Sequence, residues 1–163
     1  MRIRELAIKD IPFMLEWMHD PSVVKDLRTD FASKTEEDCR RFIEYSFNDK
    51  RNIHRAIVND EDEYLGTVSL KNVSNKSAEF AITIRAAAMG TGVSRAAMKE
   101  ILELGFRENF LDLIYWCVSP ENKRAVRFYD KNGYERVNPE QLPIGEEYSK
   151  EQVESYLWYS MHS

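Results

Sequence analysis

The feature that most constrains the fold of this chain is a strand-like run that leads through a glycine-rich turn into a helix. The run is Phe80–Ile84, and the turn is Met89–Ser94, with glycine at positions 90 and 92. Residues 98, 101, 102 and 105 then follow the i, i+3, i+4, i+7 spacing of an amphipathic helix. Glycine lets the backbone approach a ligand closely, and the free N–H groups at a helix N-terminus favour negative charge. The segment therefore predicts an anion-binding turn.

The remaining patterns predict alternating strands and helices. Asp10 and Thr35 are candidate N-caps of two early helices, and a later helix is expected over 122–131, before a terminating Asn-Gly pair. Strand patterns occupy residues 3–6, 54–58, 64–73, 78–85, 113–118, 134–137 and 156–161. We therefore expect one α+β domain over residues 1–163, with a mixed, mostly antiparallel central sheet of about seven strands flanked by about four helices.

Composition and charge exclude several classes of protein. The net charge of −5 disfavours a nucleic-acid partner, because phosphate backbones bind to a clustered basic face. The two cysteines, Cys39 and Cys117, have neither metal-ligand nor disulfide spacing, so no metal is expected. The charged first residues and the lack of a long apolar run predict neither a signal peptide nor a membrane span. A cytoplasmic protein is the resulting expectation.

The glycine-rich turn partly matches the pyrophosphate-binding loop of a large enzyme family. That loop usually reads Gln or Arg, two residues, Gly, one residue, then Gly or Ala. Here the three specified positions hold Met89, Gly92 and Ser94, and Ser94 is small enough for its place. Met89 departs from the pattern, because its side chain cannot donate a hydrogen bond to a phosphate. The departure affects one contact and not the loop as a whole, since backbone N–H groups form most of such a site.

Two further matches complete the resemblance. Residues 118–134 contain Val-Ser-Pro-Glu-Asn, then Arg-Ala-Val-Arg-Phe-Tyr and Lys-Asn-Gly-Tyr. Residues 66–68 and 78–80 contain Gly-Thr-Val and Ala-Glu-Phe. Up to about Val137 the chain resembles the GNAT superfamily of N-acetyltransferases, in the branch of the ribosomal-protein-alanine and polyamine acetyltransferases.

The resemblance implies transfer of an acetyl group from acetyl-CoA, the cosubstrate, to an amine by direct attack. We expect a primary amine of a small molecule, such as a polyamine or an amino sugar. One alternative is a protein N-terminus, as for the ribosomal-protein type, and another is a CoA-binding module without turnover. An open acceptor cleft would favour the protein substrate, and an enclosed one the small molecule. A homodimer is compatible with the family, with the strand at 156–161 serving either its interface or, more simply, the core.

By the same resemblance, acetyl-CoA lies along the strand, the turn and the later helix. The backbone of the strand at Ile82 and Ile84 is expected to pair with the pantetheine arm. Asn122 is expected to hydrogen-bond that arm, although an Asn there is equally suited to cap the helix. The residues expected to bind the cosubstrate are Ile82, Ile84, Met89, Gly90, Thr91, Gly92, Val93, Ser94, Arg95, Asn122, Ala125, Phe128 and Lys131.

Acetyl transfer needs a neutral amine, a stabilised oxyanion and a proton for the leaving thiolate. Tyr129 is the candidate acid, because a phenol of pKa ~10 and a thiol of pKa ~8.5 are close enough for proton transfer in a dry site. Glu79 is the candidate base, directly or through water, and its other reading is a solvent-facing glutamate at a strand start. His54 is an alternative base. Cys117 as a nucleophile is disfavoured, since no His or Lys adjoins it in sequence.

The acceptor site is the part that the sequence determines least. In the family the first two helices and their connection cover the acceptor, together with a late loop, here near Tyr148. These positions make Trp17, Arg28 and Asp30 candidate acceptor-binding residues, and His54 joins them from its strand.

Overall fold

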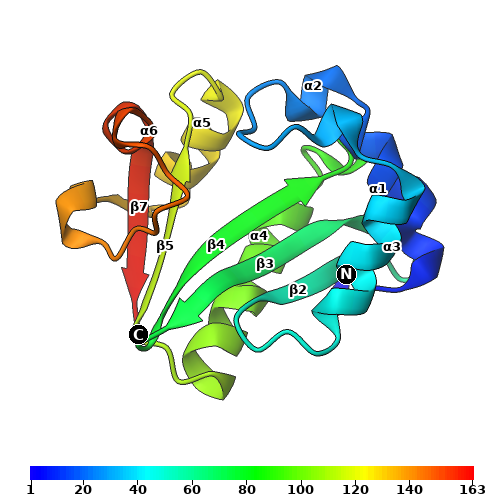
Figure 1. The fold of residues 1–163 in the computed structure, drawn as a ribbon, viewed down its shortest axis with the longest axis horizontal. Coiled ribbons are helices and arrows are strands. Elements are labelled where there is room, and N and C mark those ends of the chain that lie inside the picture. Colours follow the sequence, from blue (N-terminus) through cyan, green and yellow to red (C-terminus); the bar gives the residue numbers. More distant parts are fainter.

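A seven-stranded sheet forms the centre of the protein in this computed structural model, which describes residues 1–163 (Figure 1). The strand order is β1-β2-β3-β4-β5-β7-β6, and every neighbouring pair is antiparallel except β4 and β5. The strands are β1 (Arg2–Glu5), β2 (Ile53–Val58), β3 (Tyr64–Ser74), β4 (Ser77–Ile84), β5 (Leu113–Val118), β6 (Glu135–Arg136) and β7 (Leu157–His162). This mixed, mostly antiparallel sheet confirms the predicted fold class.

Six α-helices accompany the sheet, and none is long and apolar enough to cross a membrane. They are α1 (Ile11–Met18), α2 (Pro21–Val24), α3 (Glu36–Ser46), α4 (Val93–Glu103), α5 (Lys123–Lys131) and α6 (Lys150–Ser155). Short 3₁₀ turns occupy Ile8–Asp10, Phe31–Ser33, Ala86–Ala88 and Pro139–Gln141, and a π-helical turn, Leu104–Glu108, extends α4.

Two of the three N-cap expectations hold in the structure. The hydroxyl of Thr35 accepts from the N–H of Asp38 at the start of α3, and the side chain of Asn122 accepts from the N–H of Ala125 at the start of α5. Asp10 stands at the N-cap position of α1, as expected, but its side chain does not cap that helix. Its buried carboxylate instead accepts from the N–H of Ala7 and pairs with Arg4 at 2.8 Å, because a buried charge is stable only when it is paired.

The sheet separates two hydrophobic cores. Alternate residues of a strand point to opposite faces, so Ile57 of β2 joins a core of 15 residues built with α4, whereas Ala56 and Val58 join a core of 10 residues built with α1 and α3. We call these the α4 core and the α1–α3 core. The α4 core contains the aromatic side chains of Phe80, Trp116, Tyr129 and Tyr159.

The sheet divides into a fork between its two parallel strands. β4 and β5 pair only from Ser77–Glu79 to Leu113–Tyr115, and beyond these three register pairs they diverge. In Figure 1 the green β4 and the yellow-green β5 separate toward α2 and α5. Beyond Glu79 of β4 and Tyr115 of β5 the facing edges of the two strands do not pair. Their backbone N–H and C=O groups are therefore available inside the fork.

Candidate active site

A cavity of about 850 Å³ lies in the fork. Its walls come from β4, the turn before α4, the end of β5, the first turns of α5, the segment 22–31, and the late loop at Tyr148. Two ends can be distinguished. We call the end at the turn 88–95 and α5 the phosphate end, and the end at Glu79, the segment 22–31 and Tyr148 the acceptor end.

The phosphate end is built mainly from backbone. Gly90 and Gly92 have φ of +78° and +85°, a left-handed conformation that side chains rarely tolerate. The hydroxyl of Thr91 donates to the carbonyl of Ala88 and holds the turn closed. No side chain caps the N-terminus of α4 at Gly92, so its first N–H groups remain free to bind an anion.

The side chains at the phosphate end are mostly positively charged, as is the N-terminal end of the α4 dipole. Four cationic side chains line this part of the cavity, and only one carboxylate, that of Glu121, stands among them. The cationic side chains are those of Arg95, Lys123, Arg124 and Lys131. A long molecule with several phosphates fits this combination of a glycine turn, a free helix N-terminus and excess positive charge.

Tyr129 of α5 reaches the cavity from the α4 core. Its side chain packs on Trp116 and Tyr159, with ring centroids 5.5 and 5.1 Å away, and the residue is only 7 % exposed. Its hydroxyl forms no hydrogen bond within the chain, although the residue lines the cavity. Burial raises the pKa of Tyr129 above the ordinary value of a phenol, so the side chain is a neutral donor at neutral pH.

Glu79 stands where the fork opens, as the last β4 residue paired with β5. The residue is 3 % exposed, and its Oε1 accepts from the hydroxyl of Tyr148 at 2.5 Å and lies 3.5 Å from Nζ of Lys71. Its Oε2 has no partner. The solvent-facing reading of Glu79 is therefore wrong: the residue presents one buried, uncommitted carboxylate oxygen at the acceptor end.

Cys117 lies beside Tyr148, the residue whose hydroxyl donates to Glu79. Its thiol is 3.5 Å from the hydroxyl of Tyr148, and burial raises the pKa of Cys117 to about 11. A thiol with such a pKa stays protonated at neutral pH, and the thiolate is the nucleophilic form. The structure thus adds a second argument, burial of the thiol, to the lack of an adjacent His or Lys in the sequence.

The acceptor end is closed by a contact between two distant segments. The guanidinium of Arg28 lies over the ring of Tyr148, 4.4 Å from its centroid, and its Nη1 donates to the carbonyl of Glu147 at 3.2 Å. The side chain of Glu147 accepts in turn from Asn72 at 2.9 Å. The segment 22–31 and the late loop thereby meet over the cavity and enclose it on this side.

Three of the four candidate acceptor residues do not line the cavity. Trp17 is buried in the α1–α3 core, where its Nε1 donates to Tyr64. Asp30 lies within the segment 22–31, but it is exposed and does not line the cavity. His54 lies on β2 against Phe42 of α3, hydrogen-bonded to Ser69, and burial lowers its pKa to about 4. Arg28 alone of the four reaches the cavity, because the wall on this side is formed by α2 and the connection after it, and not by α1 or α3.

Most of the other candidates do meet there. Only Thr91 and Val93 fall outside the lining, since Thr91 turns its hydroxyl to its own loop and Val93 packs against the α4 core. The candidates that line the cavity are Glu79, Ile82, Ile84, Met89, Gly90, Gly92, Ser94, Arg95, Asn122, Ala125, Phe128, Tyr129 and Lys131. Sequence reasoning missed Lys71 as the ion-pair partner of Glu79, and no local pattern marks it.

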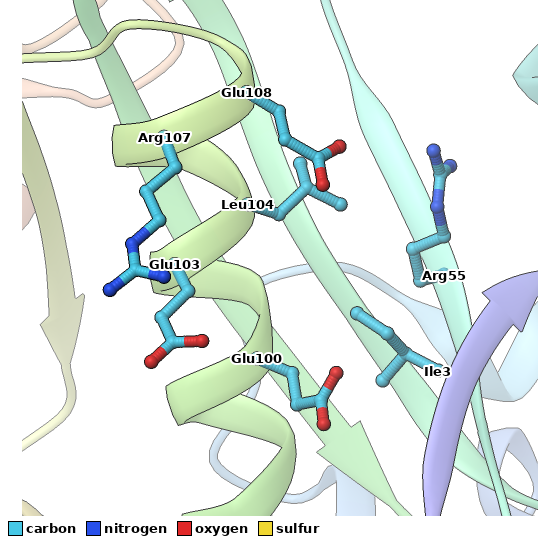
Figure 2. Close-up of a pocket in the computed structure, with 7 residues that line it drawn as sticks. All are labelled: Ile3, Arg55, Glu100, Glu103, Leu104, Arg107 and Glu108. Carbon is cyan, nitrogen blue, oxygen red and sulfur yellow. The ribbon is translucent and has the colours of Figure 1, made fainter.

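A second, smaller hollow of about 340 Å³ lies at the other end of α4 (Figure 2). Figure 2 shows Glu100, Glu103 and Glu108 projecting from α4 and its π-helical turn, and Arg55 on β2. None of the residues that line the fork cavity contributes to this hollow. None of the candidate catalytic or binding residues lines this smaller hollow.

Comparison with known proteins agrees with this geometry. The family described as acetyltransferase (GNAT) domain matches residues 1–135, so the chain belongs to the GNAT acetyltransferases and is an acyltransferase. An uncharacterized N-acetyltransferase, YnaD of Bacillus subtilis, is 30 % identical over 135 residues, covering 82 % of this chain and 78 % of the relative. Spermidine N(1)-acetyltransferase of Escherichia coli is 28 % identical over 141 residues, covering 82 % and 72 %.

The fold is shared with a solved structure of similar size. Spermidine N-acetyltransferase from Vibrio cholerae, in complex with CoA and spermine, superposes with a TM-score of 0.78. The superposition covers 99 % of this chain and 94 % of that one, at 19 % identity.

Proposed function

We propose that this protein transfers the acetyl group of acetyl-CoA to a primary amine of a small molecule by direct attack. The observation that carries the proposal is that Tyr129 and Glu79, both buried, line one cavity with the glycine turn. A phosphate-binding turn, a neutral proton donor and a free carboxylate oxygen are the groups that this transfer needs. The complex of a fold relative with CoA and spermine supports the same reading.

The cosubstrate is held by backbone and by few side chains. The free inner edge of β4 at Ile82 and Ile84 pairs with the amide groups of the pantetheine arm. The N–H groups of the turn and of α4 hold the pyrophosphate. Asn122 both caps α5 and binds the arm, because its Oδ1 accepts from Ala125 while its Nδ2 remains free to donate. Acetyl-CoA supplies the activated acyl group, and the chain supplies its position.

Protons move at two side chains. The uncommitted Oε2 of Glu79 orients the amine and accepts its proton, directly or through water. As the C–N bond forms and the C–S bond breaks, Tyr129 donates its hydroxyl proton to the leaving sulfur, which departs as the CoA thiol. Burial raises the pKa of Tyr129, but the same dry surroundings raise the proton affinity of a thiolate formed there, so the transfer remains feasible. The Tyr148 hydroxyl holds Glu79 in place from the late loop.

A small acceptor is favoured over a protein N-terminus by the enclosure of the acceptor end. The contact of Arg28 with Tyr148 and Glu147 joins the segment 22–31 to the late loop at the acceptor end, which leaves less room for an extended peptide than an open cleft would. Two relatives are named for spermidine, and a polyamine is therefore the first acceptor to test. Amino sugars and related amines follow it.

The test is release of free thiol from acetyl-CoA by the purified chain with a panel of amines. The panel holds spermidine and spermine, amino sugars and their nucleotides, aminoglycosides, and peptides with a free N-terminus. We expect saturable release with one class of small amine. Release with peptides alone would replace the small-molecule proposal by the protein-directed one. CoA binding without release across the panel would support the non-catalytic alternative.

A further inference from the structure

The glycine turn lacks one side-chain hydrogen-bond donor at Met89, and the neighbouring helix α5 places the cationic side chain of Arg124 beside that position. Met89 occupies the turn position where a side-chain donor would reach the phosphates. Arg124, in the first turn of α5, approaches that position from the opposite wall. Its Nη1 lies 2.8 Å from Sδ of Met89, and its Nη2 lies 3.9 Å from the place where a Cβ on Gly90 would stand.

The guanidinium of Arg124 is free to bind an anion. None of the ion pairs of the protein includes it, and its one hydrogen bond goes to a thioether, which is a weak acceptor. Arginine presents a rigid fork of donors that matches two oxygens of a phosphate, so a diphosphate would displace the sulfur readily. Methionine leaves room for this approach because its side chain is flexible and uncharged.

We propose that Arg124 binds the pyrophosphate of acetyl-CoA and replaces, from α5, the donor that the turn lacks at Met89. The inference rests on the proposed use of acetyl-CoA. The pyrophosphate is then held from both sides of the fork, by the N-terminus of α4 on one and by α5 on the other. Binding of the cosubstrate thereby links the two elements that the diverging strands separate.

The test is calorimetric titration of the full chain with CoA. We expect Arg124→Ala to weaken CoA binding about tenfold, as expected for loss of one charge-assisted contact of roughly 1.4 kcal/mol. Arg127→Ala is the matched control, because Arg127 lies on the same helix, is exposed, and lines no part of the cavity. It should bind CoA like the wild type. Equal affinities of the Arg124→Ala and wild-type proteins would overturn the inference.

Relocating the charge makes the test specific. In the double variant Met89→Arg/Arg124→Ala the guanidinium returns to the turn, and we expect most of the lost CoA affinity to return with it. A double variant as weak as Arg124→Ala would contradict the replacement of one donor by the other. Circular dichroism of each variant separates a change in binding from a change in folding.

Dephospho-CoA identifies the phosphate that Arg124 binds. This probe keeps the pyrophosphate and lacks the 3′-phosphate. We expect the same tenfold penalty of Arg124→Ala with dephospho-CoA as with CoA. Disappearance of the penalty would assign Arg124 to the 3′-phosphate and overturn the inference. Failure of the wild type to bind CoA would instead contradict the proposed function, so the two failures are distinguishable.

Discussion

The two ends of the fork cavity are built in different ways. The phosphate end uses a continuous turn and the first residues of two helices, and its main groups are backbone N–H groups at glycines with positive φ. The acceptor end uses side chains from segments far apart in sequence: Arg28 meets Tyr148, and Tyr148 meets Glu79. Under the proposed function, the cosubstrate would be held mainly by local backbone geometry, and the acceptor by tertiary contacts between distant segments.

Tyr129 lines the cavity from α5, and its replacement should have the largest effect. Tyr129→Phe removes only the hydroxyl, so packing against Trp116 is kept. We expect kcat to fall by about 100-fold through loss of the proton donor, with the KM of acetyl-CoA little changed. Steady-state kinetics with both substrates varied measures this. A kcat within a factor of two of the wild type would leave the acid role of Tyr129 untenable.

Glu79→Gln should damage the acceptor end alone. The amide keeps the shape of the side chain but loses the charge that orients an amine, so kcat/KM for the amine should fall about 30-fold. The affinity for CoA should remain that of the wild type, because Glu79 lies at the other end of the cavity. Steady-state kinetics with the amine varied measure kcat/KM, and calorimetric titration with CoA measures the affinity. Equal losses in kcat/KM for the amine and in affinity for CoA would contradict the assignment of Glu79 to the acceptor end alone.

Two glycine substitutions separate backbone strain from binding at the phosphate end. Gly92 and Gly133 have φ of +85° and +79°, and a Cβ on either would meet no atom within 4 Å. Replacement by Ala should lower the free energy of unfolding by about 1 kcal/mol at both positions, through the left-handed backbone alone. Only Gly92→Ala should also weaken CoA binding, by about fivefold, since Gly133 lines no part of the cavity. Denaturant unfolding and CoA titration measure the two effects.

His54 belongs to neither end, and its titration should affect stability. Burial lowers its pKa to about 4 in the folded state, against about 6.5 in the unfolded chain, so the unfolded chain binds the proton first as the pH falls. Above pH 7 the titration of His54 has little effect on the free energy of unfolding. From about pH 6.5 to 4 it lowers that free energy progressively. Between pH 7 and 6 it should lower the free energy of unfolding by about 0.7 kcal/mol.

The measurement is denaturant unfolding of the wild type and of His54→Gln at both pH values. The variant should lose this part of the pH dependence. His162→Gln is the control, because His162 is exposed near the C-terminus. An unchanged slope in His54→Gln would contradict the buried, neutral imidazole.

More of the phosphate end than of the acceptor end could be predicted from the sequence, because the phosphate end is built from local patterns. Glycine with positive φ, a helix start and an apolar strand are local patterns, and all of them lie within 80–105. The strand and helix patterns likewise predicted the sheet elements closely. Asp10 was misjudged because its partner, Arg4, competes for the carboxylate through a buried ion pair that no capping rule describes.

The acceptor end could not be derived in this way. Trp17 carries the aromatic character expected of a binding wall, but the period of α1 turns it into the α1–α3 core. Tyr148 contacts Glu79 across 69 positions, and the loop that holds it has no repeating pattern. Arg124 had a local signal, the uncharged Met89, but only the packing of α5 on the turn shows that the two residues are neighbours.

The separation of the two hydrophobic cores has a consequence for how the acceptor end can vary. Val23 and Phe31, which line the acceptor end, pack against the smaller α1–α3 core, whereas Tyr129 and Trp116 belong to the α4 core on the other face of the sheet. Substitutions that reshape this wall therefore alter the packing of a different set of buried side chains from those that surround Tyr129. The wall of the acceptor end can thus change in shape while the packing that positions Tyr129 is kept.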